Sequence, residues 1–253
     1  MTWSDYIDES YNGQTLCVGG WLAPDRAWER IATKWKQRID YERRISIKRG
    51  FPPISRYHAA DCSSLKGEFD RSRGWDQGRQ LRLSKRLFQI LGDSCPVGIV
   101  IGGAVADFKR NFPADAKRPL KAIYYFSIIM NLYEVADVMR AGFQGDRVSV
   151  YYDRTRTFGQ IARKAFHSLM SDPHNAEVSK YFTDMTEIGW EHCIPLQPAD
   201  LIAYEGMKRV DGSLRGKDAM RRSLQALIGK NIPIKIGHFD DNALRKVIDR
   251  YKR

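Results

Sequence analysis

The spacing of apolar residues near the N-terminus predicts a β-hairpin followed by a long helix. Residues 2–9 and 14–23 are rich in Trp, Tyr, Ile, Val and Leu, with the turn residues Asn12 and Gly13 between them. In the segment 26–48, apolar residues recur near helical spacing, and Lys and Arg occupy the other faces. We therefore expect a hairpin and then an inserted basic amphipathic helix.

The rest of the chain alternates between helix and strand patterns. A near-continuous apolar run at 97–105 predicts a strand covered on both faces and central in its sheet. The other expected elements are a short strand at 57–61, a polar loop at 63–78, helices at 75–92, 119–140, 158–170 and 197–209, and strands at 147–152 and 178–186. This order predicts an α/β fold with a mixed sheet flanked by helices.

Three aspartates far apart in the chain lie at the ends of such apolar segments. Asp8 and Asp153 end predicted strands, and Asp200 lies in the first turn of a predicted helix. An aspartate that ends an apolar run is poorly solvated unless it meets a cation. We therefore expect folding to bring the three carboxylates into one metal site, of the kind that supports metal-assisted phosphodiester chemistry.

Four short motifs occur in a fixed order and carry a resemblance. They are Tyr6–Ser10 (YIDES), Tyr57–Asp61 (YHAAD), the strand-end Asp153 and Leu196–Tyr204 (LQPADLIAY). Together they resemble the domain-of-unknown-function 3800 family over about residues 4–208. The resemblance implies a ribonuclease H-like fold over residues 1–210 and a metal-dependent nuclease site.

The resemblance also implies roles for the three aspartates. Asp8 would be the central ligand and would bridge two cations, Asp153 would join it from a neighbouring strand, and Asp200 would close the site from a helix. Carboxylates suit Mg²⁺ or Mn²⁺, which prefer hard oxygen ligands. Two such ions roughly 3.5 to 4 Å apart would activate the attacking water and stabilise the departing oxygen.

Four further residues are candidates for this site. Glu9 points away from the preceding aspartate unless the strand bends, so it is either a second ligand or an exposed acid at a strand end. Gln197 shares a helical face with Asp200 and either orients it, contacts substrate, or makes an ordinary hydrogen bond near the helix start. His58 and Asp61 would supply a ligand, a proton shuttle or a phosphate contact, or else His58 is an interior histidine.

Composition adds a class of partner and a location. The chain has 253 residues, with 42 Lys and Arg against 30 Asp and Glu, a net charge of +12 and a pI of about 9.6. Residues 207–253 hold thirteen Lys and Arg and five Asp and Glu, so +8 of this charge follows the last motif. We expect a nucleic-acid partner and a basic, helical C-terminal extension, 211–253, packed on the same domain.

Four dispersed cysteines and the lack of an apolar stretch long enough to span a bilayer favour a cytoplasmic protein.

These features favour a divalent-metal-dependent nuclease that hydrolyses phosphodiester bonds in RNA or DNA. One alternative is a catalytically inactive nucleic-acid-binding module of a defence or mobile-element system, and another is a structural or partner-binding protein that uses the same fold. The acidic set favours the enzyme, because a binding surface gains nothing from negative charge beside phosphates. The basic excess disfavours the structural protein.

Overall fold

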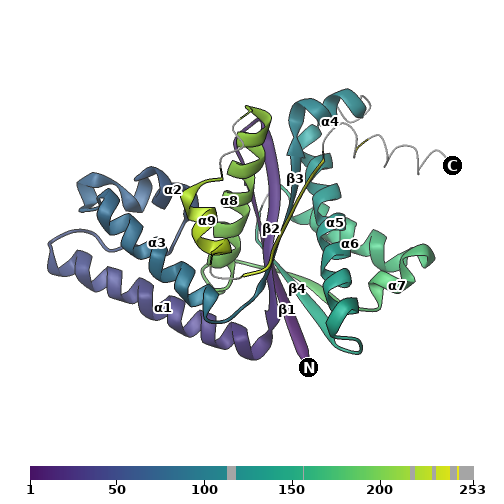
Figure 1. Cartoon of the computed structure of the whole chain (residues 1–253), viewed down its shortest axis with the longest axis horizontal. Helices are drawn as coiled ribbons and strands as arrows, with labels where there is room; N and C mark the ends of the chain where they lie inside the picture. The colour runs from purple at the N-terminus through teal and green to yellow at the C-terminus, as the bar shows by residue number, and fades with distance from the viewer. Residues whose placement is uncertain (113–117, 156, 217–219, 230–231, 240–243, 245–253) are drawn as a thin grey trace.

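The N-terminal hairpin forms as predicted and lies at the centre of a six-stranded mixed sheet (Figure 1). The computed structural model describes residues 1–112, 118–155, 157–216, 220–229, 232–239 and 244. The strands are β1 (Thr2–Tyr11), β2 (Thr15–Pro24), β3 (Val97–Ala104), β4 (Arg147–Asp153), β5 (Phe182–Ile188) and β6 (Ile234–Phe239). Their order is β5-β4-β1-β2-β3-β6, with β2 antiparallel to both of its neighbours and all other pairs parallel.

Local sequence explains the tight connection of the hairpin. The Asn12 side chain accepts hydrogen bonds from the backbone N–H groups of Gln14 (3.1 Å) and Thr15 (3.0 Å). Gly13 has a φ of +86°, in the left-handed region that residues with a side chain rarely adopt. The turn therefore fixes the register in which β1 and β2 pair, and with it the face to which each β1 side chain points.

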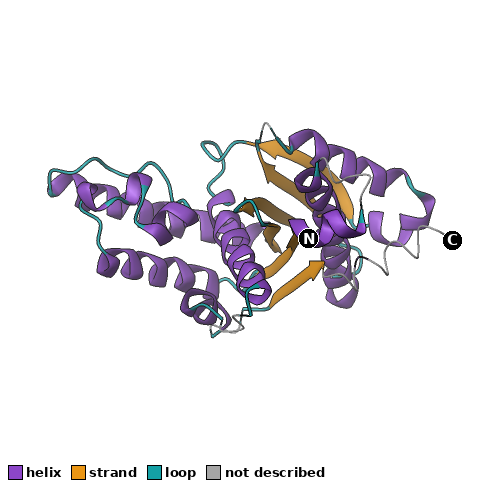
Figure 2. Cartoon of the chain, turned by 90° about the horizontal axis from the view of Figure 1, so that it is seen from above, coloured by secondary structure: helices purple, strands orange, loops and turns teal. Residues whose placement is uncertain are grey.

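Helices cover both faces of the sheet (Figures 1 and 2). One face carries α1 (Asp25–Lys48), α2 (Ala59–Ser64), α3 (Gln77–Gly92), α8 (Leu196–Leu214) and α9 (Arg222–Ile228). The other face carries α4 (Val105–Asn111), α5 (Pro119–Gly142), α6 (Gly159–Ser171) and α7 (Ala176–Ser179). Among the described helices, none has the length and apolar character needed to cross a membrane.

Two hydrophobic cores, one on each face, set the direction of the β1 side chains. Trp3 and Ile7 are buried in the core under α5 and α6. Tyr6 packs on the opposite face, where its ring centroid lies 4.6 Å from that of Trp28 on α1. Since side chains alternate along a strand, Asp8 lies on the face that α1 and α8 cover.

Most predicted elements are confirmed, but the strand predicted at 57–61 is wrong. Only Tyr57 and His58 precede a helix that begins at Ala59, where the Cys62 N–H bonds to the His58 carbonyl at 2.9 Å. The extended conformation of His58 satisfies the local pattern, but no neighbouring strand lies beside it within the described sheet, and the alanines that follow favour a helix.

Four smaller expectations also need correction. The predicted loop at 63–78 contains short 3₁₀ turns, and the strand expected at 178–186 begins only at Phe182, because a helical turn occupies Ala176–Ser179. β3 is not central, since only β6 separates it from the sheet edge. The C-terminal extension contains a strand, β6, besides the helix α9, because its apolar residues complete the sheet. Residues 217–219, 230–231, 240–243 and 245–253 of that extension lie outside the described residues.

Candidate functional site

Parallel pairing of β1 with β4 brings the first two aspartates together. The last registered pair is Ile7 with Tyr152, so Asp8 and Asp153 follow it on adjacent strands. Neighbouring strands lie about 4.8 Å apart. The rings of Tyr6 and Tyr151, two residues earlier on each strand, stack at 4.8 Å, which shows that this row of side chains shares one face.

Close contact between α8 and the sheet adds the third aspartate. Gly19 on β2 pairs with Asp8, and a Cβ atom added to Gly19 would lie 2.6 Å from the Cα and N atoms of Ala203. The missing side chain therefore allows the backbone of α8 to lie directly on β2 beside Asp8. Asp200 lies one turn before Ala203, so the first turn of α8 carries its carboxylate to the same place.

The electrostatic properties of Asp8 confirm that these carboxylates are neighbours. Burial raises the pKa of Asp8 well above its usual range, and the negative charges of Glu9, Asp200 and Asp153 raise it further. The opposing contribution comes from the Glu9 N–H, which donates to Asp8 Oδ1 at 2.8 Å. A cation at this position would relieve the repulsion, because it stabilises every charged carboxylate at once.

Cations and backbone donors partly stabilise the other two carboxylates. Burial raises the pKa of Asp153, whereas its Arg154 N–H bond (2.9 Å) and the charge of Arg56 lower it. Burial also raises the pKa of Asp200, whereas His58 and the Ala59 N–H bond to Oδ2 (2.7 Å) lower it. The first residues of α2 therefore hold Asp200 in a fixed orientation.

Glu9 belongs to the electrostatic cluster but points to the other face of the sheet. β1 continues without a bend as far as Tyr11, and Glu9 pairs with Val18. Burial and the charge of Asp153 raise the pKa of Glu9 to about 7, and a hydrogen bond from Thr155 opposes this. The side chain is half-buried, so it is not the exposed strand-end acid that was one of the two expectations.

Gln197 connects three segments around the site. Its Oε1 atom accepts hydrogen bonds from the Trp35 indole N–H (3.1 Å) and the Tyr57 backbone N–H (2.9 Å). Both donors are buried, and together they join α8 to α1 and to the chain that enters α2. Because Oε1 is occupied, the structure favours the interpretation of Gln197 as a hydrogen-bonding residue near the helix start.

His58 and Asp61 form a pair beside the cluster. His58 Nδ1 lies 3.0 Å from Asp61 Oδ2, and both side chains are partly exposed. The charge of His58 also lowers the pKa of Asp200. His58 is therefore near the carboxylates and is not an interior histidine, whereas Asp61 is connected to them through His58.

Sequence reasoning missed Arg56 and Gly19. The Arg56 guanidinium lies over the Trp190 ring at 4.0 Å, and its charge lowers the pKa of both Asp153 and Asp200. Its place directly before the Tyr57–Asp61 motif is the only sequence signal for it. Gly19 has no signal of its own, because its function depends on a helix about 180 residues later in the chain.

The carboxylates fit a divalent cation by their chemistry. Asp8, Asp153 and Asp200 offer the hard oxygen ligands that Mg²⁺ and Mn²⁺ prefer. Across the described ranges, no group of three His, Cys, Asp or Glu side chains is already arranged so that it could hold a metal ion. The three aspartates that would hold a metal ion are therefore identified by their shared location and by the repulsion between their charges.

No family model matches this chain, and no curated protein shows significant similarity to it.

Proposed function

We propose that this chain is a divalent-metal-dependent nuclease that hydrolyses phosphodiester bonds in RNA or DNA. The observation that carries the proposal is the convergence of Asp8, Asp153 and Asp200, which come from β1, β4 and α8. The charges of Asp153 and Asp200 add to the effect of burial in raising the pKa of Asp8. Perturbed carboxyl groups that gather in one place are typical of functional sites. The resemblance of the four motifs to the domain-of-unknown-function 3800 family supports the same activity.

The proposed fold class is ribonuclease H-like. Two features of the architecture support it: the first strand lies in the middle of a mixed sheet, and helices cover both faces. The carboxylates lie on that middle strand, on the parallel strand beside it and on a helix packed over both, as the resemblance implies.

Bound Mg²⁺ or Mn²⁺ would supply an activated water and charge stabilisation for the leaving oxygen. Asp8, Asp153 and Asp200 would hold the ions. Arg56 would offer its guanidinium to a phosphate oxygen, since it lies beside two of these carboxylates. His58, which is paired with Asp61, would hold or release a proton next to Asp200.

The decisive experiment compares cleavage by wild-type protein with cleavage by Asp8→Asn and Asp200→Asn. Labelled single-stranded and double-stranded RNA and DNA are incubated with Mg²⁺, Mn²⁺ or a chelator. We expect metal-dependent cleavage that both substitutions reduce by at least about 100-fold, and that Asp137→Asn, at a surface position on α5, leaves unchanged. Undiminished cleavage by both site variants would refute the site.

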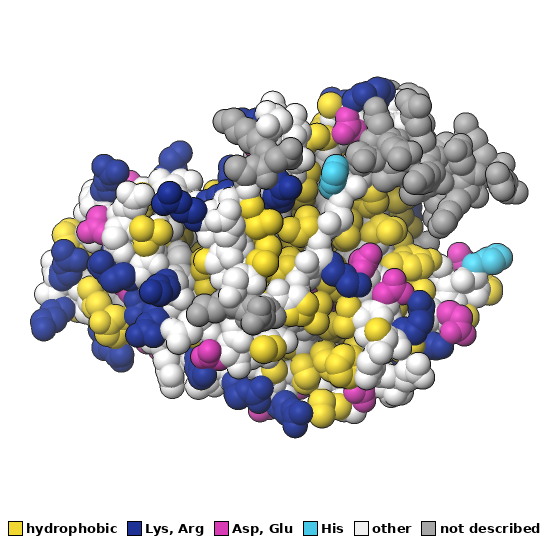
Figure 3. Space-filling model, viewed as in Figure 1, with side chains coloured by type: hydrophobic (Ala, Val, Ile, Leu, Met, Phe, Trp, Pro, Cys, Tyr) yellow, Lys and Arg dark blue, Asp and Glu magenta, His cyan; other side chains and the backbone are white. Residues whose placement is uncertain are grey.

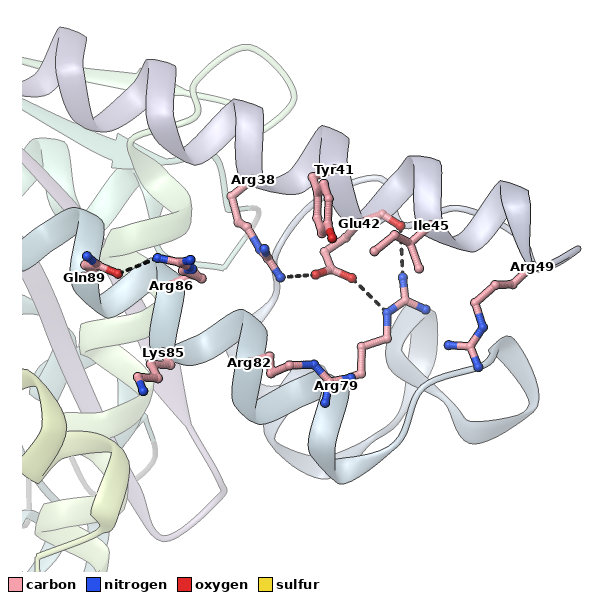
Figure 4. A pocket seen from close by; sticks show the side chains of 10 residues that line it. All are labelled: Arg38, Tyr41, Glu42, Ile45, Arg49, Arg79, Arg82, Lys85, Arg86 and Gln89. Atoms are coloured by element: carbon pink, nitrogen blue, oxygen red, sulfur yellow. Dashed lines mark hydrogen bonds and ion pairs between the residues drawn. The ribbon is translucent and has the colours of Figure 1, made fainter.

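The inactive binding module remains the second candidate, because a strongly basic groove lies on the same side of the sheet (Figure 4). Calorimetric titration with Mn²⁺ separates the two. The nuclease proposal expects binding that Asp8→Asn weakens, whereas absence of both Mn²⁺ binding and cleavage would favour the binding module.

A further inference from the structure

Helices α1 and α3 enclose a groove of about 750 Å³ that the acidic site does not use (Figure 4). Its ten lining residues include six cations and one acid, Glu42. They are Arg38, Tyr41, Glu42, Ile45, Arg49, Arg79, Arg82, Lys85, Arg86 and Gln89. Figure 3 shows Lys and Arg side chains gathered over this part of the molecule.

Buried contacts of Glu42 hold the two helices together. Glu42 is only 1% exposed and accepts hydrogen bonds from Arg38 on its own helix and from Arg79 Nε (2.8 Å) on α3. Arg79 also donates to the Glu42 carbonyl and to Ser46 Oγ, both at 2.9 Å, and its guanidinium lies 3.9 Å over the Trp75 ring. This network compensates the charge of Glu42 and fixes the walls of the groove.

The remaining cations face the solvent. Arg49, Arg82, Lys85 and Arg86 are all exposed. Arg86 donates to Gln89 Oε1 at 2.9 Å, and within the described residues none of the four forms a salt bridge. These four positive charges line one groove and repel one another. An anion bound in the groove would relieve this repulsion and would be attracted by several of them at once.

A second hollow, of about 310 Å³, extends the groove along the same helices. It shares Arg38, Tyr41, Arg86 and Gln89 with the first and adds Lys34 together with Asp93, whose carboxylate lies 3.8 Å from Lys34 Nζ. The two hollows together form an elongated surface lined by more cations than acids, and this shape fits a chain of phosphates better than one phosphate. Arginine matches phosphate geometry in particular, because its guanidinium donates two parallel hydrogen bonds.

The basic C-terminal segment is a weaker candidate for the same role. Seven of its thirteen Lys and Arg residues lie outside the described part of the chain. Of the others, Arg215 pairs with Asp211 (3.1 Å), Arg221 with Glu205 (3.4 Å) and Lys235 with Glu134 (2.9 Å). Much of its described charge is thus already neutralised, in contrast to that of the groove.

We propose that the α1–α3 groove binds the sugar–phosphate backbone of a nucleic acid. The inference deepens the proposed function, because the bound polymer would be the substrate of the acidic site. α1 connects the two places: one of its faces lines the groove, and its Trp35 bonds to Gln197 beside the carboxylates. Positive charge in the groove offsets the repulsion that the carboxylates exert on an approaching phosphate.

The test measures binding of fluorescently labelled single-stranded DNA, single-stranded RNA and duplex DNA by anisotropy, with chelator present so that no cleavage occurs. The variant Arg82→Gln/Lys85→Gln/Arg86→Gln removes three exposed charges from α3. The matched control, Lys109→Gln/Lys121→Gln/Lys164→Gln, removes three exposed charges from the opposite face. Circular dichroism melting checks that both variants fold as the wild type does.

We expect the groove variant to weaken binding about 100-fold at about 0.1 M salt and to lower the slope of log affinity against log salt by about 2, since three phosphate contacts are lost. The control variant should change affinity by less than about threefold. Equal losses in the two variants, or a wild-type protein that binds none of the three polymers, would overturn the proposal.

A further variant separates this proposal from the nuclease activity. Asp8→Asn should keep the binding that depends on the groove, because Asp8 is not among the residues that line the groove. Binding that depends on the groove, together with no cleavage by the wild type, would leave the groove established and refute the nuclease. Cleavage that is indifferent to the groove variant at low substrate concentration would refute the groove as the substrate site.

Discussion

Replacing Asp5 by asparagine should change how the stability of the protein depends on pH. Asp5 is fully buried on β1, on the face opposite the carboxylate cluster, and neither of its oxygens has a hydrogen-bond partner among the described residues. Gly20 leaves room for it, because a Cβ atom there would lie 3.1 Å from Asp5 Oδ1. Burial raises the pKa of Asp5 from 3.8 to about 7.

The direction of the effect follows from proton binding. Between pH 3.8 and about 7, the unfolded chain has released the Asp5 proton while the folded chain keeps it. The unfolded state therefore binds fewer protons, and the free energy of unfolding falls as the pH rises through this window. At about 1.4 kcal/mol for each pKa unit, the stabilisation that is present below pH 3.8 and lost above pH 7 is about 4 kcal/mol.

The Asp5→Asn variant lacks this titration. Its amide is still unpaired, which costs about 1–3 kcal/mol at every pH. The difference in the free energy of unfolding, variant minus wild type, should therefore rise by about 4 kcal/mol between about pH 4 and pH 8. Urea unfolding followed by circular dichroism, with chelator present, measures this difference across the range.

The other raised carboxyl groups are present in both proteins and cancel in this comparison. Gly142→Ala, at a position where an added Cβ atom meets nothing within 4 Å, serves as a control; it changes no titratable group, so its difference should change little with pH. A flat difference for Asp5→Asn would refute the reasoning, because it would mean that Asp5 ionises as freely in the folded protein as in the unfolded chain.

Three further predictions concern the packing and charge of the same structure. Gly19→Ala should destabilise the protein by about 1–3 kcal/mol, because the added methyl group forces α8 away from β2. Gly142→Ala should cause no such loss, because its added methyl group meets nothing within 4 Å. Denaturant midpoints of the two variants measure the difference. Glu42→Gln should lower the free energy of unfolding by about 3–5 kcal/mol, because it leaves Arg79 buried beside a neutral side chain. A loss below about 1 kcal/mol would contradict the claim that the salt bridge between Glu42 and Arg79 holds α1 and α3 together. Calorimetric Mn²⁺ affinity should rise with pH, because the pKa of Asp8 is raised and its carboxyl group must release a proton before it can hold the ion; a flat profile would contradict this.

The sequence predicts those elements whose patterns are long and local. The hairpin can be predicted because Asn12 and Gly13 have the chemistry of a turn, and the helix that carries Asp200 can be predicted from its spacing. The proximity of Asp8 and Asp153 follows from the expectation that both end neighbouring strands, and the pairing of β1 with β4 confirms it.

Features that depend on distant contacts cannot be predicted in this way. A short extended stretch at Tyr57 and His58 has the same local pattern whether or not a partner strand exists, so the helix at Ala59 was not predictable from it. Nothing around Gly19 indicates that a helix packs on its Cα atom. The groove likewise depends on the pairing of Glu42 with Arg79, which are 37 residues apart, because this pairing decides which basic residues face each other.

The pairing of β3 with β6 has a consequence for the order in which the protein can be completed during synthesis. β3 is an apolar strand, and its outer edge is paired through the registers Gly98–Ile234 to Gly103–Phe239. A ribosome makes residue 104 long before residue 234, so a nascent chain carries this edge with unpaired N–H and C=O groups for about half of its translation. Such an edge recruits other strands, including those of neighbouring chains. A messenger cut short before β6 would therefore yield a product prone to aggregate, even though every residue of the acidic site had been made.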